Sequence, residues 1–295
     1  MVLYSCTHCG SSFPRRQLFV EHSSECLTSG NQTRVNHLSP MVKWSGGKSD
    51  ELKYILPHIP QEYDKYLEPF IGGGSVFFHI NPRQAVIGDV HTELTDFYKA
   101  IKDGHGEEIY EYMKNHPNDE KTYYEVRTSN HSDPLENAKR FYYLRKTCFR
   151  GMLRYNQKGE FNIPFGRYKN YNYEDVRNKD YEELLQRTEV LNVGFEHIFE
   201  NYNDANNFMF LDPPYDSEFT DYGYCSFGKN EQQKLAELFK TTSIKCLMII
   251  GKTDFICELY KDYIVDEYDK KYKFKIHSGR IGDEINTKHL IIKNY

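Results

Sequence analysis

The sequence predicts an α/β protein whose doubly wound sheet consists mainly of parallel strands. Short apolar runs, typical of buried strands, alternate with segments of helical periodicity along most of the 295 residues. Acidic residues stand at the ends of three of these runs, at Glu68, Asp89 and Asp212. Because a doubly wound sheet binds its ligands at the carboxyl ends of its strands, we expect the three acids to share one site.

The composition predicts an intracellular protein. No apolar run is long enough to cross a bilayer, and the N-terminus lacks the pattern of a signal peptide. Seven cysteines without a disulfide-like framework fit a reducing compartment. We therefore expect a protein that is not secreted: cytoplasmic, or located in the nucleus or a viral factory if its source is a eukaryotic virus. The net charge of −5 does not by itself indicate a nucleic-acid partner, but the charge is unevenly distributed.

Residues 1–28 have the ligand spacing of a small zinc finger. A Cys-x2-Cys pair is followed after twelve residues by His-x3-Cys, giving the candidate ligands Cys6, Cys9, His22 and Cys26. Phe13 and Phe19 stand where such a finger places its two core side chains. A unit of this size needs the metal to fold, so a structural zinc ion is expected. The alternative is a frayed tail with stray cysteines. The spacing does not decide whether such a finger would bind DNA or protein. Residues 29–40 are polar and predict a flexible linker.

The folded core is expected to begin at residue 41, with a turn that contains the only tryptophan. Gly46 and Gly47 would let the backbone approach a ligand, and Lys48 could neutralise a carboxylate. An ordinary turn would have the same composition.

Residues 66–89 predict a strand, a glycine loop, a helix and a second strand. The loop is Ile71-Gly72-Gly73-Gly74-Ser75, and the second strand ends in Asp89. An acid at that position is well placed to accept hydrogen bonds from ribose hydroxyls. The glycine spacing differs from that of dinucleotide sites, and no phosphate-binding loop is present. A nucleoside cofactor without phosphates therefore fits better than a dinucleotide or ATP.

Residues 94–136 predict charged, tyrosine-rich helices, which we interpret as an inserted subdomain. The stretch that follows has one acid, Glu160, and many interleaved aromatic and basic residues, the basic ones being Lys139, Arg140, Arg145, Lys146, Arg150, Arg154, Lys158, Arg167 and Lys169. Within it, residues 156–159 predict a hairpin turn. A basic hairpin of this kind suits a DNA duplex, whereas a solvated charged face would contain more acids.

The rest of the chain returns to alternating elements. We expect helices at 181–190 and 231–240, strands at 193–199, 208–210 and 246–250, and a final hairpin at the sheet edge formed by 272–276 and 289–292.

The turn Asp212-Pro213-Pro214-Tyr215 is the strongest candidate for chemistry. Two prolines fix the backbone, so the carboxylate, the carbonyls and the aromatic ring are held at set angles. The Asp212 carboxylate and a backbone carbonyl can accept hydrogen bonds from a planar amine while Tyr215 stacks on its ring. The alternative is a capping turn in which Asp212 starts a helix.

Taken together, the motifs KWSGGK, EPFIGGGS, RYNQKGEFNIPFGRY and DPPY, with an acid at Asp89, resemble the Dam-type (D12 class) adenine-specific DNA methyltransferases. The resemblance covers residues 41–295. It implies a class I methyltransferase fold that binds S-adenosylmethionine, with a target-recognition domain at 96–169 inserted between two catalytic segments, 41–95 and 170–295. Relatives of this kind also serve in restriction-modification systems.

The resemblance assigns roles by position. It implies that the cofactor contacts are Trp44, Lys48, Asp89 and Asp212, with the glycine motif residues Glu68, Phe70, Gly72 and Gly74, and with Phe165 near the cofactor's adenine. The chemistry falls to Asp212, Pro213, Pro214 and Tyr215. DNA contacts fall to Lys43, Arg154 and Tyr168, and to Arg150, which replaces a short amide of the relatives.

The recognition sequence is open because the chain departs from the family there. Besides Arg150, the triplet Leu144-Arg145-Lys146 replaces the usual Leu-Asn-Arg. Arg154 matches a guanine-reading arginine, which favours GATC or a related short site. The zinc finger is not part of the usual family architecture.

The leading hypothesis is methyl transfer to the N6 amino group of adenine in double-stranded DNA, with the base flipped out of the helix. One alternative is an RNA adenine methyltransferase, which the duplex-suited hairpin disfavours. Another is a catalytically silent zinc-finger DNA-binding protein, in which decay of DPPY or the glycine motif would be expected. We expect a monomer or a weak dimer.

Overall fold

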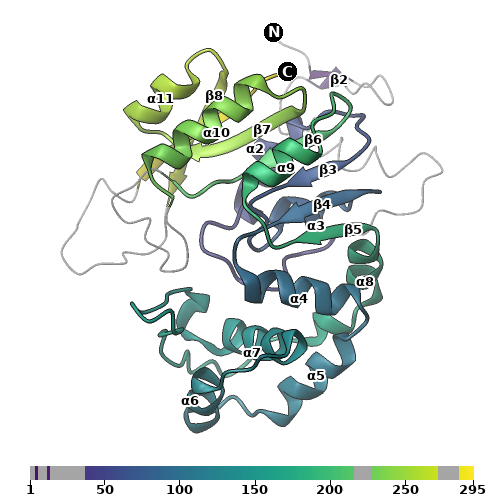
Figure 1. The fold of residues 1–295 in the computed structure, drawn as a ribbon, viewed down its shortest axis with the longest axis vertical. Coiled ribbons are helices and arrows are strands. Elements are labelled where there is room, and N and C mark those ends of the chain that lie inside the picture. Colours follow the sequence, from purple (N-terminus) through teal and green to yellow (C-terminus); the bar gives the residue numbers. More distant parts are fainter. Residues whose placement is uncertain (1–3, 6–11, 14–36, 216–226, 272–285) are drawn as a thin grey trace.

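A seven-stranded sheet forms the centre of the molecule (Figure 1). This computed structural model describes residues 4–5, 12–13, 37–215, 227–271 and 286–295. The strand order is β5-β4-β3-β6-β7-β9-β8, in which the first five are parallel and β9 is antiparallel to both of its neighbours. The strands are β3 (Tyr66–Glu68), β4 (Ala85–Gly88), β5 (Thr188–Leu191), β6 (Phe208–Leu211), β7 (Lys245–Gly251), β8 (Ile264–Lys271) and β9 (Asn286–Lys293). This mixed α/β sheet is consistent with the class I methyltransferase fold that the sequence predicts.

Apolar side chains alternate between two cores because successive strand residues point to opposite faces. In β6, Phe208 and Phe210 join one core, and Met209 and Leu211 join the other. Helices α9 (Phe195–Asn201), α10 (Lys229–Thr241) and α11 (Asp254–Tyr260) cover the second face. Helices α2 (Leu52–Ile55), α3 (Ser75–Ile80), α4 (Thr92–Lys102) and α8 (Lys179–Gln186) cover the first.

Three further helices extend the first core away from the sheet, beyond α4 (Figure 1). They are α5 (Gly106–Asn115), α6 (Glu120–Thr128) and α7 (Pro134–Thr147). Asp133 caps α7 by accepting hydrogen bonds from the N–H groups of Leu135 and Glu136, and Pro134 occupies its first turn. Short 3-10 turns complete the described helices: η1 (Ser49–Glu51), η2 (Leu56–His58), η3 (Phe149–Gly151) and η4 (Glu174–Arg177).

The predicted hairpin turn at 156–159 is present. The N–H of Asn156 donates to the carbonyl of Glu160, and Tyr155 forms an antiparallel bridge with Phe161. The strands predicted at 208–210 and 246–250 lie within β6 and β7, and the helix predicted at 231–240 lies within α10.

The prediction for residues 181–199 was wrong in two places. The expected helix at 181–190 ends at Gln186 and is followed by β5, and the expected strand at 193–199 is helix α9. Phe195, Ile198 and Phe199 have the i, i+3, i+4 spacing of a helix face, and Gly194 stands at its N-cap. The run is apolar enough to resemble a strand, so only its period distinguishes the two structures.

The final hairpin consists of β8 and β9, and β9 contains the predicted strand 289–292. The strand predicted at 272–276 lies outside the described residues.

At the N-terminus, β1 (Tyr4–Ser5) pairs in antiparallel fashion with β2 (Ser12–Phe13). The predicted zinc ligands Cys6, Cys9, His22 and Cys26 lie outside the described residues. Within the described ranges, no three His, Cys, Asp or Glu side chains are grouped so as to hold a metal ion. No helix in that part of the chain is both long and apolar enough to cross a bilayer.

Candidate active site

Asp212 and Lys48 form an ion pair at the carboxyl edge of the parallel strands. Asp212 directly follows β6, and its Oδ2 lies 2.7 Å from Lys48 Nζ, although the two residues are 164 positions apart in sequence. Lys48 is 2% exposed and also donates to the carbonyl of Gly46 at 2.6 Å. The structure therefore brings together two of the predicted cofactor-site residues and neutralises the buried ammonium group.

Three acids surround this edge of the sheet, as the sequence predicts. Burial raises the pKa of Asp212, with Lys48 opposing the shift. Burial and the charge of Asp212 raise the pKa of Glu68 well above its ordinary value, although Tyr66 donates a 2.6 Å hydrogen bond to its Oε2. Burial also raises the pKa of Asp89 to about 6, against hydrogen bonds from backbone N–H groups. Two of these carboxyl groups, those of Asp212 and Glu68, interact electrostatically with the single ammonium group of Lys48, and this excess of acids favours a ligand that carries positive charge.

The Asp89 carboxylate is held by the glycine loop. Its Oδ2 accepts from the N–H of Gly72 at 3.1 Å, and its Oδ1 accepts from the N–H of His91 at 2.9 Å. Tyr98 closes the loop from α4 by donating to the carbonyl of Gly72 at 2.7 Å. The acid predicted to bind ribose hydroxyls therefore has a fixed orientation.

Trp44 packs directly on this loop. Gly72 has a φ of +45°, and a Cβ at that position would lie 2.6 Å from Cδ1 of Trp44. Only glycine combines this conformation with so close an approach. The loop and the indole thus form one surface beside Asp89. Phe70, which precedes the loop, packs against Phe195 and Phe227 on the other side of the sheet.

The ring of Tyr215 has neighbours on several sides. His289 lies edge-on to it with the ring centroids 5.1 Å apart, and Lys48 Nζ lies 5.3 Å from its centroid. A Cβ on Gly251 of β7 would approach its Cδ2 to 3.2 Å. Gln232 of α10 donates to the carbonyl of Pro214 at 2.7 Å, which holds the turn itself. The aromatic ring and the backbone of the turn are therefore both fixed.

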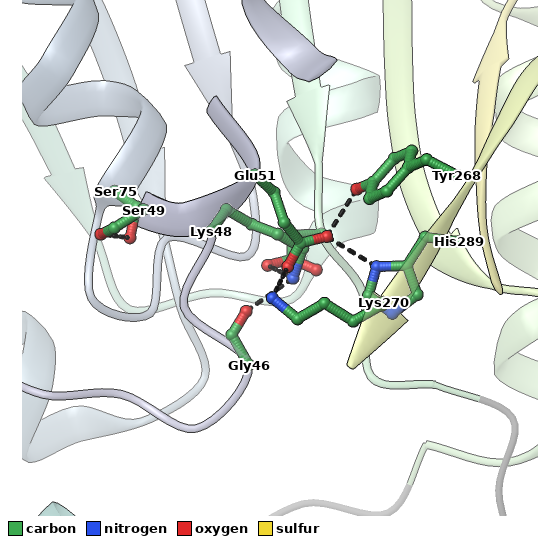
Figure 2. Close-up of polar contacts among 9 residues, drawn as sticks. Gly46, Lys48, Ser49, Glu51, Ser75, Tyr268, Lys270 and His289 are labelled. Atoms are coloured by element: carbon green, nitrogen blue, oxygen red, sulfur yellow. Dashed lines mark hydrogen bonds and ion pairs between the residues drawn. The ribbon is translucent and has the colours of Figure 1, made fainter. Parts of the chain in front are cut away.

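Sequence reasoning missed the buried residues that lie next to this turn. Figure 2 shows Glu51 of η1 meeting Tyr268, Lys270 and His289, which come from β8 and β9, with Lys48 close by. Burial alone would raise the pKa of Glu51, but the hydrogen bond with His289, the charge of Lys48 and hydrogen bonds from Lys270 and Tyr268 lower it to about 2. No local motif marks these positions, because the partners lie more than 200 residues away from Glu51.

A second buried network links Asp89 to the basic hairpin through His91, whose N–H donates to Asp89. His91 Nδ1 accepts from the N–H of Leu94, so Nε2 carries the proton and faces Tyr155 Oη at 2.6 Å. Tyr155 donates to Glu93 at 2.8 Å, and Glu93 pairs with Arg140. Burial and the nearby charge of Arg145 lower the pKa of His91 to about 3, so this imidazole is neutral.

The basic stretch is only partly available to a DNA duplex. Arg140 and Arg145 are 7% and 1% exposed, and Arg145 donates to the carbonyls of Lys43, Gly151 and Met152. The expectation that the whole stretch forms one basic surface was therefore wrong for these two residues. Buried charges need protein partners. Glu93 and the carbonyls of Val126 and Arg127 in α6 supply them for Arg140, and the loop after α7 supplies two of the three carbonyls for Arg145. The exposed basic residues are Arg150, Arg154, Lys158, Arg167 and Lys169.

The four predicted DNA contacts lie on or near that loop. Lys43 is exposed, and its Nζ lies 4.9 Å from the centroid of the Tyr168 ring. Arg150 has a φ of +56°, and Arg154 donates from Nε to Oδ1 of Asn162 at 2.8 Å. Phe165, predicted to lie near the cofactor, packs against Tyr123 of α6 with ring centroids 5.3 Å apart.

A cavity of about 710 Å³ lies among α5, α6 and α7. Four glutamates line it, Glu108, Glu111, Glu125 and Glu136, so it does not suit a polyanion such as DNA.

Comparisons of the sequence with known proteins show similarity to one family. The sequence profile of the D12 class N6 adenine-specific DNA methyltransferases matches residues 44–276. The chain is 60% identical over 260 residues to the Type II methyltransferase M.CviBI of Paramecium bursaria Chlorella virus NC1A, covering 88% of this chain and 100% of that protein. It is 31% identical to the Type II methyltransferase M.MjaIII of Methanocaldococcus jannaschii, covering 88% and 99%. It is 30% identical to the DNA adenine methylase of Haemophilus influenzae, covering 86% and 88%.

Proposed function

The chain belongs to the D12 class of N6 adenine-specific DNA methyltransferases. On this basis we propose how the site at the carboxyl ends of its parallel strands acts. It is an adenine-specific DNA methyltransferase, and the cofactor expected for this family is S-adenosylmethionine. The proposal is that Asp212 and Tyr215 hold a flipped adenine of duplex DNA next to that cofactor. The observation that carries it is the ion pair at the end of β6 between the half-buried Asp212 and the buried Lys48.

The residues at the site fit the cofactor. Asp212 and Glu68 beside Lys48 suit a ligand with a sulfonium and an ammonium group. Asp89, which backbone N–H groups hold in place, would accept hydrogen bonds from ribose hydroxyls. The surface of Trp44 and Gly72 would support the nucleoside. When bound, S-adenosylmethionine supplies an activated methyl group, so the protein's task is to position the acceptor and exclude water.

Asp212 and the following backbone would position the adenine amine. The carboxylate can accept one N–H of the amine, and a carbonyl of the turn can accept the other. Gln232 donates one hydrogen bond to the carbonyl of Pro214, and a carbonyl oxygen can accept two, so each carbonyl of the turn remains a candidate for the second acceptor. Hydrogen bonds of this kind leave the nitrogen lone pair directed at the methyl group. Tyr215 would stack on the base, which favours adenine in the site over adenine in the helix.

The exposed residues of the loop and hairpin would hold the DNA. Flipping a base costs a few kcal/mol, which contacts with phosphates and neighbouring bases must offset. Lys43, Arg150, Arg154 and Tyr168 are the candidates, and Arg154 could donate two hydrogen bonds to a guanine edge. We propose GATC or a related short site on this basis.

Transfer of tritium from labelled S-adenosylmethionine tests the proposal. We expect cofactor binding in the absence of nucleic acid, and label incorporated into adenine of duplex DNA but not of RNA with the same sequence. Incorporation into RNA alone would favour an RNA methyltransferase. Cofactor binding without transfer to either would contradict the assignment of Asp212 and Tyr215, and no cofactor binding at all would favour a silent DNA-binding protein.

We also propose that residues 1–28 bind one structural zinc ion through Cys6, Cys9, His22 and Cys26. The spacing of the four side chains supports this, as does the pairing of Tyr4 with Phe13 and of Ser5 with Ser12. That pairing encloses the sequence positions of the two cysteines, as expected for the hairpin of a ββα finger.

A further inference from the structure

The carboxylate of Glu51 is the centre of a buried cluster next to the catalytic turn. Its Oε2 accepts from Tyr268 at 2.5 Å and lies 2.7 Å from His289 Nδ1, and its Oε1 accepts from Lys270 at 2.6 Å. Glu51 is 2% exposed and His289 is 1% exposed. An ionised carboxylate only accepts hydrogen bonds, so Nδ1 of His289 carries the proton that it shares with Glu51. This bond fixes the plane of the imidazole.

The imidazole in turn contacts the aromatic ring of the catalytic turn. Its ring is nearly perpendicular to that of Tyr215, with an interplanar angle of 88° and a centroid distance of 5.1 Å. The backbone of Gly251 packs against another part of the same ring, since a Cβ on Gly251 would lie 3.2 Å from Cδ2 of Tyr215. Rotation of His289 would therefore release Tyr215 from one of the contacts that fix it.

We propose that Glu51, acting through His289, positions Tyr215 for stacking on the target adenine. The proposal rests on the function proposed above, because it presumes that Tyr215 contacts the base. Glu51 and His289 are positioning residues, since the contact reaches the substrate only through Tyr215. The cluster would thereby connect β8 and β9, on which none of the motifs lies, to the catalytic turn (Figure 2).

A double-mutant cycle tests this dependence. We would measure the single-turnover rate at saturating DNA and cofactor for Glu51→Gln, Tyr215→Ala and the double variant, together with the dissociation constants of DNA and S-adenosylmethionine. Misplacement of a stacking ring should lower the rate of Glu51→Gln about tenfold with both dissociation constants changed less than about twofold. In the Tyr215→Ala background the same substitution should have little further effect, because the ring that it positions is absent.

Two further variants keep the result interpretable. His289→Gln retains a donor for Glu51 but removes the ring that contacts Tyr215, so it should reproduce the slow rate even if Glu51→Gln fails to fold. Glu267→Gln is the matched control, because Glu267 is an exposed acid on β8 that binds Lys252 and Lys288, and it should keep the wild-type rate.

The outcomes separate the two proposals. Independent losses that multiply in the double variant would overturn the positioning role of Glu51, and so would a wild-type rate for His289→Gln. A wild-type rate for Tyr215→Ala would instead overturn the stacking function on which the inference rests.

Discussion

Asp212 is the residue on which the chemistry depends, and it also neutralises Lys48. We predict that Asp212→Ala loses more than about 90% of the transfer rate, since removing a hydrogen-bond acceptor that acts in the transition state typically costs a hundredfold or more. The substitution also leaves the buried ammonium group of Lys48 without its carboxylate, so the melting temperature should fall. Asp212→Asn, which keeps one acceptor oxygen, should be intermediate in rate. Single-turnover kinetics and thermal unfolding measure both effects, and retention of a tenth of the rate by Asp212→Ala would contradict the assignment.

The raised pKa of Asp89 leads us to expect that cofactor binding depends on pH. Its pKa is raised by burial to about 6, so the group is a carboxylate above that pH and a neutral acid below it. A neutral acid accepts more weakly from ribose hydroxyls. The dissociation constant of S-adenosylmethionine should therefore rise as the pH falls from 7 to 5. Titration calorimetry should find a flat profile over this range for Asp89→Asn, and parallel profiles for the two proteins would refute the role.

At the scale of elements, the glycine loop is the most constrained segment of the site. We predict that Gly72→Ala lowers the affinity for S-adenosylmethionine about tenfold, which is about 1.4 kcal/mol, because the added Cβ must displace Trp44. Gly104→Ala is the control. It has a φ of +87° and thus similar backbone strain, but its Cβ would meet nothing closer than 3.7 Å. Equal affinities for the two variants would show that the indole does not support the cofactor.

The elements also show where a sequence pattern is ambiguous. The strands at 208–210 and 246–250 were correctly predicted because both are apolar throughout and are buried on both faces. The segment 193–199 was not, because a short apolar run fits a strand as well as a buried helix face. As helix α9, the segment places Phe195, Ile198 and Phe199 in the same core as Val86 of β4.

At the scale of the whole molecule, the zinc finger should be dispensable for catalysis. Leu38 is buried and its N–H donates to the carbonyl of Phe78, so a truncated protein should begin at His37 in order to keep this contact. We predict about one zinc ion per full-length chain, none in the truncated protein, and full methyl transfer by both at saturating DNA. Metal analysis and tritium transfer measure these quantities. Loss of catalysis on truncation would mean that the finger belongs to the catalytic fold.

The DNA sequence that the protein selects also depends on the whole fold, because the fold decides which basic side chains are exposed. Arg145 is buried, so the departure from the family at this position serves the protein interior, whereas Arg150 and Arg154 are exposed. We predict methylation at a short site with a guanine next to the target adenine, as in GATC. Mapping of methylated adenines on a plasmid tests this. Sites without an adjacent guanine would refute the role of Arg154, and a change of site on Arg150→Asn would assign base reading to Arg150.

The sequence by itself determined the parts of this protein that depend on short segments. The glycine loop, the double proline turn and the acids at the ends of the strands are local patterns, and parallel strands bring their carboxyl ends to one edge whatever the details of packing. The pairing of Lys48 with Asp212 is not such a pattern, because Lys48 lies in the turn before η1 and meets Asp212 across 164 positions of sequence only in the folded chain.

Only the tertiary structure decided which charges are buried and what they contact. Glu51 and His289 meet because η1 lies against the hairpin of β8 and β9, and nothing near either residue in the sequence encodes that contact. In the sequence, Arg145 is likewise indistinguishable from the other basic residues of its stretch. Only the fold shows that it is surrounded by carbonyl groups. A buried charge is stable only with partners, and partners from distant segments are fixed by packing rather than by local sequence.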